Sequence, residues 1–391
     1  MRAPLIALAL LFAACTSVPT VTEPTPRPTR EPNTVSVSVL LDLSGSRAPS
    51  GQPQRNAMQL WLDRAQAAQP RSAVKLRVKF VDVAGSDAKL LLELRRAAVD
   101  DGADAVVVGV PIALDDTFAR AVELASVPVL LTLPAPEPAG AVGGRWTFAL
   151  APTPRNIAHA LVDDLAARDL LPPTVLAGDE TAPAITERAA FAAEIGARGR
   201  VAPTPVILTQ PDGPQRAKAA VAGARSVVLS GASEKYAELV RGIPSALEAP
   251  RVYLSYLTET ADITNLRDQS ALVTWPGSRN LATLSVTPFW PERAAFVRAF
   301  SDRHGAPSTL AATAYDALAI LSAAAEQAPS ELEGPRLRLR LETLTFVGVV
   351  TRYSFTFTRH AGFAPDDLTY LRWNGRAGAP FLATEPKENP R

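Results

Sequence analysis

The sequence predicts an α/β protein made of two doubly wound lobes joined by a hinge, and two patterns support this prediction. From residue 34 onward, short apolar runs rich in β-branched residues alternate with segments in which apolar residues recur at helical spacing. A segment rich in proline and glycine, residues 135–144, interrupts this alternation, which then begins again. Because strands that alternate with helices form parallel sheets covered on both faces, the interruption separates two such sheets.

The predicted elements follow one another regularly along the chain. In the first series, the strands are 34–43, 74–83, 103–110 and 127–133, and the helices are 54–69, 87–101 and 115–125. In the second series, the helices are 154–168, 182–197, 214–224 and 234–241, and the strands are 174–178, 202–209, 226–231 and 249–256. Two further helices are predicted at 291–304 and 310–327, and residues 351–359 and 367–373 alternate like an antiparallel hairpin at a sheet edge.

The composition is that of a folded protein and indicates no charged partner. The chain has 391 residues, of which 47% are hydrophobic and 20% charged, so it can build a large core. Its formal net charge is +1, and basic and acidic residues are interspersed. The absence of a basic stripe argues against nucleic acid as a partner.

The N-terminus has the features of an export signal. Arg2 precedes a short apolar run, residues 5–12, which is well below the roughly 20 residues that span a bilayer. The segment 11–15, Leu-Phe-Ala-Ala-Cys, resembles a bacterial lipobox, although Phe12 stands where leucine is usual. This resemblance implies a signal peptide of residues 1–14 and lipid attachment at Cys15, the one cysteine of the chain. An ordinary signal peptide with an incidental cysteine is the alternative.

Residues 15–33 are rich in proline and threonine and contain almost no large apolar side chain, so they predict an extended tether. At roughly 3.1 Å per residue, such a tether would reach about 50 Å from a membrane. The last residues, 383–391, are predicted to be a flexible tail.

Ligands of open parallel sheets bind beyond the carboxyl ends of the strands, and two lobes place that position in the gap between them. Hydroxyls and backbone N–H groups at strand ends, together with aromatic side chains near the hinge, are therefore candidate ligand contacts. These candidates are Ser44, Ser46, Thr132, Gly231, Ser233, Tyr256 and Trp275. The alternatives are turn formation or capping for the serines, a bond to its own backbone for the threonine, and hinge packing for the aromatic residues.

Four segments carry further motifs: 35–63 with Leu43-Ser44-Gly45 and Gly51, 78–109 with Asp82, 296–324 with Ala314-Tyr315-Asp316, and 344–355 with its phenylalanine-glycine-valine turn. In this order they resemble the branched-chain amino-acid binding proteins, which are type I periplasmic binding proteins that serve ABC importers. The resemblance covers about residues 34–376 and implies two Rossmann-like lobes. The first lobe is expected to comprise 34–147 plus about 278–325, and the second 148–277 plus about 326–382.

In that family, backbone groups and hydroxyls from two loops of the first lobe hold the carboxylate and ammonium of an amino acid. The matching loops here are 109–112 and 132–136, so the resemblance adds Pro111 and Ala135 to the candidate ligand contacts. The serine expected near Pro111 and the threonine expected near Pro136 are absent, and proline has no backbone N–H to donate.

Two further positions of the family pattern also differ. Ala149 stands where the family often has arginine, and Pro183-Ala184 stands where a Tyr-Gly pair is common. The signature for α-amino acids is therefore largely lost, while the binding fold is kept.

The sequence contains no recognisable catalytic or metal-binding arrangement. The histidines, His159, His304 and His360, fall in different predicted elements, and His360 is expected in an exposed loop. No nucleophile elbow and no phosphate-binding loop occur in the sequence. No catalytic residue, metal or cofactor is therefore predicted, and an enzyme on this scaffold is the weakest of the functional hypotheses.

The resemblance and the N-terminal signal together imply a lipid-anchored solute-binding protein of an ABC-type importer, facing the periplasm or the cell exterior. Its expected partners are a small solute (an amino acid, an amide or a related compound), the permease membrane subunits and the membrane. The alternative is a non-transport envelope lipoprotein on the same fold, acting as a sensor or as a docking activator of another protein.

Overall fold

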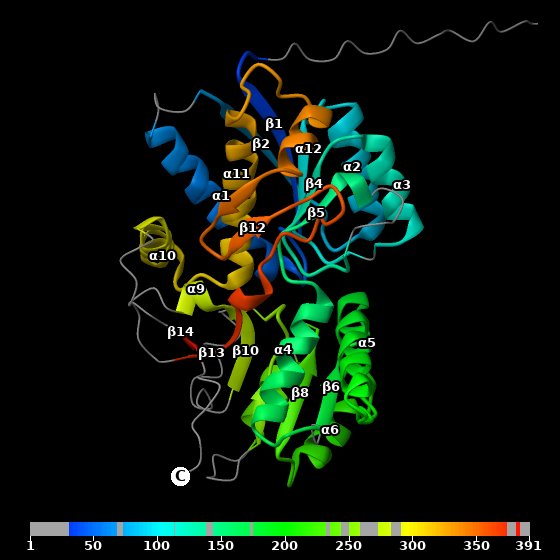
Figure 1. The fold of residues 1–391 in the computed structure, drawn as a ribbon. Coiled ribbons are helices and arrows are strands. Elements are labelled where there is room, and N and C mark those ends of the chain that lie inside the picture. The colour runs from blue at the N-terminus through cyan, green and yellow to red at the C-terminus, as the bar shows by residue number, and fades with distance from the viewer. Residues whose placement is uncertain are drawn as a thin grey trace, which may run out of the picture.

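The computed structural model describes residues 31–68, 73–112, 114–137, 144–172, 175–231, 235–243, 250–258, 273–282, 291–373 and 381–383. Within these residues the chain forms two large sheets, one in each lobe with helices packed on its faces (Figure 1), and a small sheet of two strands. The expected signal peptide, Cys15 and most of the tether and tail lie outside the described residues.

The first lobe contains a parallel sheet with the strand order β2-β1-β3-β4-β5. Its strands are β1 (Thr34–Leu41), β2 (Lys75–Asp82), β3 (Ala105–Val108), β4 (Val129–Leu131) and β5 (Thr147–Ala149). Its helices include α1 (Ala48–Ala67), α2 (Asp87–Val99), α3 (Asp116–Ala125) and, from much later in the chain, α11 (Thr309–Glu326). Helix α11 packs beside α1, so distant parts of the chain share one core.

The second lobe contains a sheet with the order β14-β13-β10-β9-β8-β6-β7. Its parallel strands are β6 (Val175–Gly178), β7 (Val206–Ile207), β8 (Ser226–Ser230), β9 (Arg251–Tyr253) and β10 (Val273–Ser278), while β13 (Leu368–Trp373) and β14 (Phe381–Ala383) are antiparallel. Its helices are α4 (Pro154–Ala167), α5 (Ala182–Ala197), α6 (Gly213–Val221) and α7 (Lys235–Arg241). Two doubly wound lobes, as the sequence predicts, are confirmed.

The predicted hairpin of 351–359 with 367–373 is wrong. Strand β12 (Arg352–Ser354) pairs with β11 (Thr345–Val347), whereas β13 pairs with β10 and β14. Alternation in a sequence indicates a strand with two different faces, but it does not identify the partner strand.

Part of the late chain lies in the first lobe, although the sequence analysis placed 326–382 in the second. Leu337 and Leu341 of helix α12 (Gly334–Leu341) and Tyr353 of β12 share an apolar cluster with Val37 of β1. The chain rejoins the second sheet only at β13.

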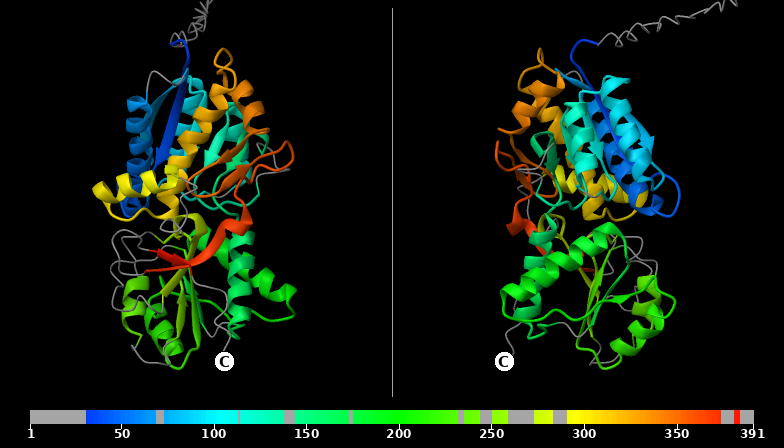
Figure 2. Two further views of the ribbon diagram at one scale, coloured as in Figure 1. Left: turned by 60° about the vertical axis from the view of Figure 1, so that its left-hand side comes forward. Right: turned by 90° about the vertical axis from the view of Figure 1, so that its right-hand side faces the viewer.

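The chain passes between the lobes three times, and these passages form the hinge (Figure 2). The first leaves the carboxyl end of β5 and enters α4, and the second leaves the carboxyl end of β10, enters α9 (Arg279–Ala282) and leads to α10 (Pro291–His304), which packs on α1. The third leads through a 3-10 turn, Pro365–Asp367, into β13. Because the chain leaves each sheet at strand carboxyl ends, those two edges face each other.

Asp316 of α11 holds the segment that leads into the third passage. Its Oδ1 accepts the N–H of Val349 at 2.8 Å, and its Oδ2 accepts the N–H of Val350 at 2.9 Å and the hydroxyl of Tyr353 at 3.0 Å. A Cβ on Gly348 would overlap the Asp316 carboxyl, so this close approach requires glycine. The Ala-Tyr-Asp segment and the phenylalanine-glycine-valine turn are therefore in direct contact.

Candidate functional site

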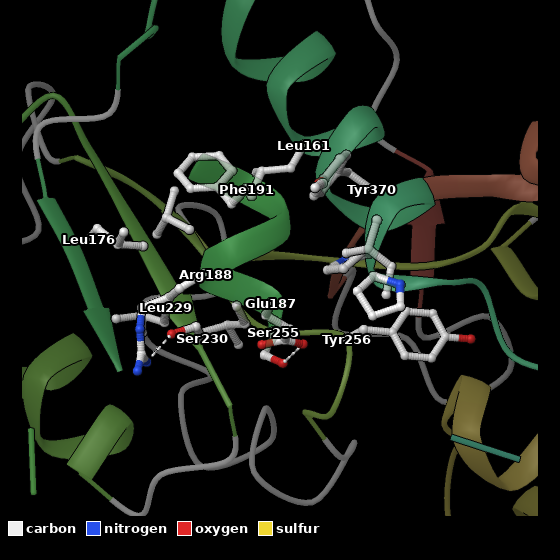
Figure 3. A pocket seen from close by; sticks show the side chains of 16 residues that line it. Leu161, Leu176, Glu187, Arg188, Phe191, Leu229, Ser230, Ser255, Tyr256 and Tyr370 are labelled. Carbon is white, nitrogen blue, oxygen red and sulfur yellow. Dashed lines mark hydrogen bonds between the residues drawn. The ribbon is translucent and has the colours of Figure 1, made fainter. Parts of the chain in front are cut away.

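A pocket lies in the second lobe, where the carboxyl ends of β8 and β9 meet helices α4 and α5 beside the hinge (Figure 3). Most of its walls are apolar, and they are formed mainly by Ile157, Leu161, Leu176, Phe191, Val228, Leu229 and Leu254. Its polar lining comes from Glu187, Arg188, Ser230 and Ser255, and Tyr256 also borders it. The cavity volume is about 30 Å³, enough for a short alkyl group or about two water molecules.

Glu187 is the central polar group of this pocket. Its Oε2 accepts the backbone N–H of Gly231 at 2.7 Å, and its Oε1 accepts the hydroxyl of Ser255 at 2.6 Å. The surrounding protein desolvates the carboxyl and raises the pKa of Glu187 to about 7, which the two hydrogen bonds oppose. The residue nevertheless keeps partial contact with solvent. A perturbed carboxyl in a mostly apolar pocket is typical of a functional site.

The strand ends around Glu187 position a second carboxylate and one guanidinium. Asp179, which follows β6 and is 4% exposed, accepts the N–H of Thr181 at 3.0 Å. Arg188 uses Nη1 to donate to the carbonyl of Asp179 at 2.7 Å and to Oγ of Ser230 at 2.9 Å. The guanidinium thus binds strand-end groups, and the two carboxylates outnumber it.

Gly231 adopts a left-handed conformation, with φ of +84°, directly after β8. A Cβ at this position would press against Asp179 and Ala184, so glycine is required for the N–H to reach Glu187.

The strand ends of the first lobe are bonded within the lobe. The fully buried Gln54 of α1 donates from Nε2 to the carbonyl of Gly109 at 2.9 Å and accepts the hydroxyl of Thr132 at 2.7 Å. Ser44 donates its hydroxyl to Asp82 at 2.5 Å, and this bond is the main reason that the pKa of Asp82 is lowered. The hydroxyls of Thr132 and Ser44 thus already have partners.

Of the predicted ligand contacts, Tyr256 lines the pocket, and Gly231 lies beside it, where its N–H binds the pocket residue Glu187. Tyr256 is 2% exposed and also belongs to the apolar cluster of the hinge, with Leu133 and Val350. Trp275 is 4% exposed and packs in the core of the second lobe.

The remaining predicted contacts lie elsewhere. Ser46 is exposed at the start of α1, Pro111 is half-buried after β3, and Ala135 is buried in the core beneath α2 and α3. Ser233 lies outside the described residues.

Four polar residues at the strand ends were not among the predicted contacts, namely Glu187, Arg188, Ser255 and Gln54. Ser255 had a signal, because it lies at the end of a predicted strand beside Tyr256. Glu187, Arg188 and Gln54 stand in amphipathic helices, where such residues usually face solvent.

His360 is not in an exposed loop, as the sequence suggested, but is 2% exposed. Its ring stacks on Phe148 with centroids 4.3 Å apart, and its Nδ1 lies 2.9 Å from the carbonyl of Gly144 and 3.0 Å from that of Thr147. Among the described residues, no group of three or more metal-ligating side chains comes together, and no helix is long and apolar enough to cross a bilayer.

The raised pKa of Glu187 predicts a specific pH dependence of stability. In the unfolded chain the carboxyl ionises near its ordinary pKa of 4.5, whereas in the folded protein it ionises near 7. Between these values the folded state binds more protons, so the free energy of unfolding falls as pH rises from about 4.5 to about 7 and is level above that. Glu187→Gln removes this contribution, and its urea unfolding curves at pH 5 and pH 8 should differ by about 2 kcal/mol less than those of the wild type. Equal differences in the two proteins would contradict the assignment.

A mainly parallel sheet in each lobe, three chain passages between the lobes and strand carboxyl ends that face each other define the two-lobed fold of a type I periplasmic binding protein. The model of the family described as periplasmic binding protein matches residues 34–379, so the chain belongs to this family. Among curated proteins, none matches the sequence.

Solved structures share the fold at low sequence identity. An extracellular ligand-binding receptor from Rhodopseudomonas palustris is 16% identical with a TM-score of 0.74, and the match covers 91% of this chain and all of that one (100%). The substrate-binding protein LivJ of the branched-chain amino-acid transporter from Streptococcus pneumoniae, solved in complex with isoleucine, is 18% identical with a TM-score of 0.68, over 90% of this chain and 99% of that one. The leucine-binding protein LivK from Thermotoga maritima is 13% identical with a TM-score of 0.69, over 90% and 98% respectively.

Proposed function

We propose that this protein is a lipid-anchored, extracytoplasmic solute-binding protein of an ABC-type importer and that it has no enzymatic activity. It captures a small solute at the facing strand ends and holds it by closing the two lobes. Family membership and the fold shared with LivJ and LivK support this role.

The observation that carries the proposal is the pocket beside the hinge, with Glu187 and Ser255 at the strand ends of the second lobe. The carboxyl can orient a small ligand through hydrogen bonds, and the apolar cavity beside it can enclose an apolar part of that ligand. The position next to the chain passages couples occupancy of the pocket to the angle between the lobes.

Thermal unfolding of the mature protein with a panel of amino acids, amides, urea-like compounds, amines and aromatic acids tests solute capture. A true solute at one hundred times its Kd should add roughly 2.7 kcal/mol to the free energy of unfolding. A panel without any stabilising compound would count against solute capture.

The lipid anchor gives a separate prediction. Replacing Cys15 with serine removes the thiol that would be acylated, so the protein should move from the membrane fraction to the soluble extracytoplasmic fraction. Fractionation followed by immunoblotting measures the distribution, and metabolic labelling with a palmitate analogue should mark the wild type alone. Serine at Thr16 is the matched control, and it should leave the protein in the membrane. Membrane retention of the Cys15→Ser protein would exclude the anchor.

One observation favours the second candidate function, a docking or sensing lipoprotein. In the first lobe, Thr132 and Ser44 already use their hydroxyls within the lobe, which leaves fewer groups for a solute. Affinity purification from detergent-solubilised membranes distinguishes the two roles. An ABC permease with its ATPase supports solute import, whereas a membrane protein without an ATPase supports docking.

A further inference from the structure

The polar groups of the pocket also indicate which class of solute fits. Glu187 accepts two hydrogen bonds, from Gly231 and Ser255, whereas an ionised carboxylate offers about four acceptor positions. Because Glu187 lines the pocket, a hydrogen-bond donor on a ligand in the pocket can use the remaining positions. Asp179 lies close enough to affect the ionisation of Glu187 and adds a second negative charge.

The same geometry is unfavourable for a ligand with a free carboxylate. Among the described strand-end residues of the second lobe, the N–H of Gly231 and the hydroxyl of Ser255 are donors beside the pocket, and both already bind Glu187. The carboxylate of such a ligand would be repelled by Glu187 at close range. The guanidinium of Arg188 offsets this only in part, because it supplies one positive charge beside the carboxylates of Glu187 and Asp179, and its Nη1 is directed to the carbonyl of Asp179 and to Oγ of Ser230.

The strand-end loops of the first lobe are poor in donors. Its two strand-end loops contain Pro111, Pro134 and Pro136, which have no N–H. The hydroxyl of Thr132 is bonded to Gln54. The two loops therefore present fewer donors to a carboxylate than loops without these prolines would.

We propose that the solute is a small organic cation, such as an alkylammonium or amidinium compound, that carries a short alkyl group and no free carboxylate. Its cationic head donates to Glu187, and its alkyl group enters the apolar cavity between α4 and α5. This inference rests on the proposed function of solute capture. It separates this protein from LivJ, which was solved with isoleucine, a zwitterion.

Four compounds of similar shape and different charge test the inference. They are isobutylammonium chloride, sodium isovalerate, isovaleramide and leucine, each titrated into the mature protein by calorimetry at pH 8. Isobutylammonium should bind, and isovalerate should bind at least tenfold more weakly. At pH 6 about one tenth of Glu187 is ionised, so the apparent affinity for the cation should fall about tenfold.

Two variants assign the binding to the pocket. Glu187→Gln should weaken isobutylammonium binding at least tenfold, and Ser255→Ala, which leaves the charge in place, should weaken it severalfold and serves if Glu187→Gln does not fold. The matched control is Glu194→Gln on the same helix, because Glu194 lies outside the pocket and pairs with His159. The control should bind as the wild type does.

The outcomes distinguish an error in the class of solute from an error in the proposed solute capture. Binding of leucine or isovalerate without binding of isobutylammonium would overturn the cation assignment and leave solute capture standing. Binding of isobutylammonium that Glu187→Gln and Ser255→Ala leave unchanged would overturn the pocket assignment. If no compound of this set binds, the cation assignment fails, and the broad thermal panel decides on solute capture.

Discussion

Replacing Asp316 with alanine is expected to lower the free energy of unfolding by about 3–5 kcal/mol. The substitution removes the acceptor of two backbone N–H groups, those of Val349 and Val350, and of the Tyr353 hydroxyl. These donors are buried, so water cannot replace the carboxyl. Urea unfolding at pH 8 measures the effect, because the pKa of Asp316 is raised to about 7 by burial and the group is ionised there in both states.

Two variants make this result specific. Asp316→Asn keeps the shape and one acceptor oxygen but places an NH₂ group against a donor, so its loss should be smaller than that of alanine. Asp302→Ala removes an exposed aspartate from α10 and should change the free energy of unfolding by less than about 0.5 kcal/mol. An Asp316→Ala protein as stable as Asp302→Ala would mean that this carboxyl does not hold the hinge segment.

Most helices and most parallel strands could be predicted because local spacing specifies them, but β10, which is central in the second sheet, was not among the predicted strands. Helix α10 begins and ends where the apolar spacing of 291–304 placed it, and α5 coincides with 182–197. The short strand β5 and helix α12 were not predicted, because three and eight residues are too few for a clear period. The partner of β12 was mistaken because pairing depends on the return of the late chain to the first lobe, which no local pattern records.

The pocket lies at strand ends, where the sequence also placed the candidate contacts Gly231 and Tyr256, and ligand binding by these two residues stays a prediction. The polar lining of the pocket did not follow from the sequence. Glu187 and Gln54 could not be found, because a polar residue in an amphipathic helix acquires a role only when the helix packs its end against strand termini. The hydrogen bonds of Glu187 with Gly231 and Ser255 connect α5 to the ends of β8 and β9, which are far apart in sequence.

Gly51→Ala is expected to destabilise the protein by about 3 kcal/mol, at the upper end of overpacking effects. Gly51 lies in the first turn of α1, and a Cβ there would overlap the backbone carbonyl of Asp42, directly after β1. Backbone cannot rotate away as a flexible side chain can, so the helix itself must move. That helix carries Gln54, which binds Gly109 and Thr132 at the strand ends of the first lobe. The substitution should therefore weaken solute binding as well as stability.

Glycine to alanine in another helix should have the opposite effect on the free energy of unfolding. Gly196 lies near the end of α5, is exposed, and has no atom within 4 Å of the position that a Cβ would occupy. Alanine there should raise the free energy of unfolding by about 0.5 kcal/mol, because alanine has the higher helix propensity. Urea midpoints of the two variants, measured side by side, separate close backbone approach from the general effect of adding a methyl group. A Gly51→Ala protein as stable as Gly196→Ala would show that α1 can move away from the end of β1 without loss of stability.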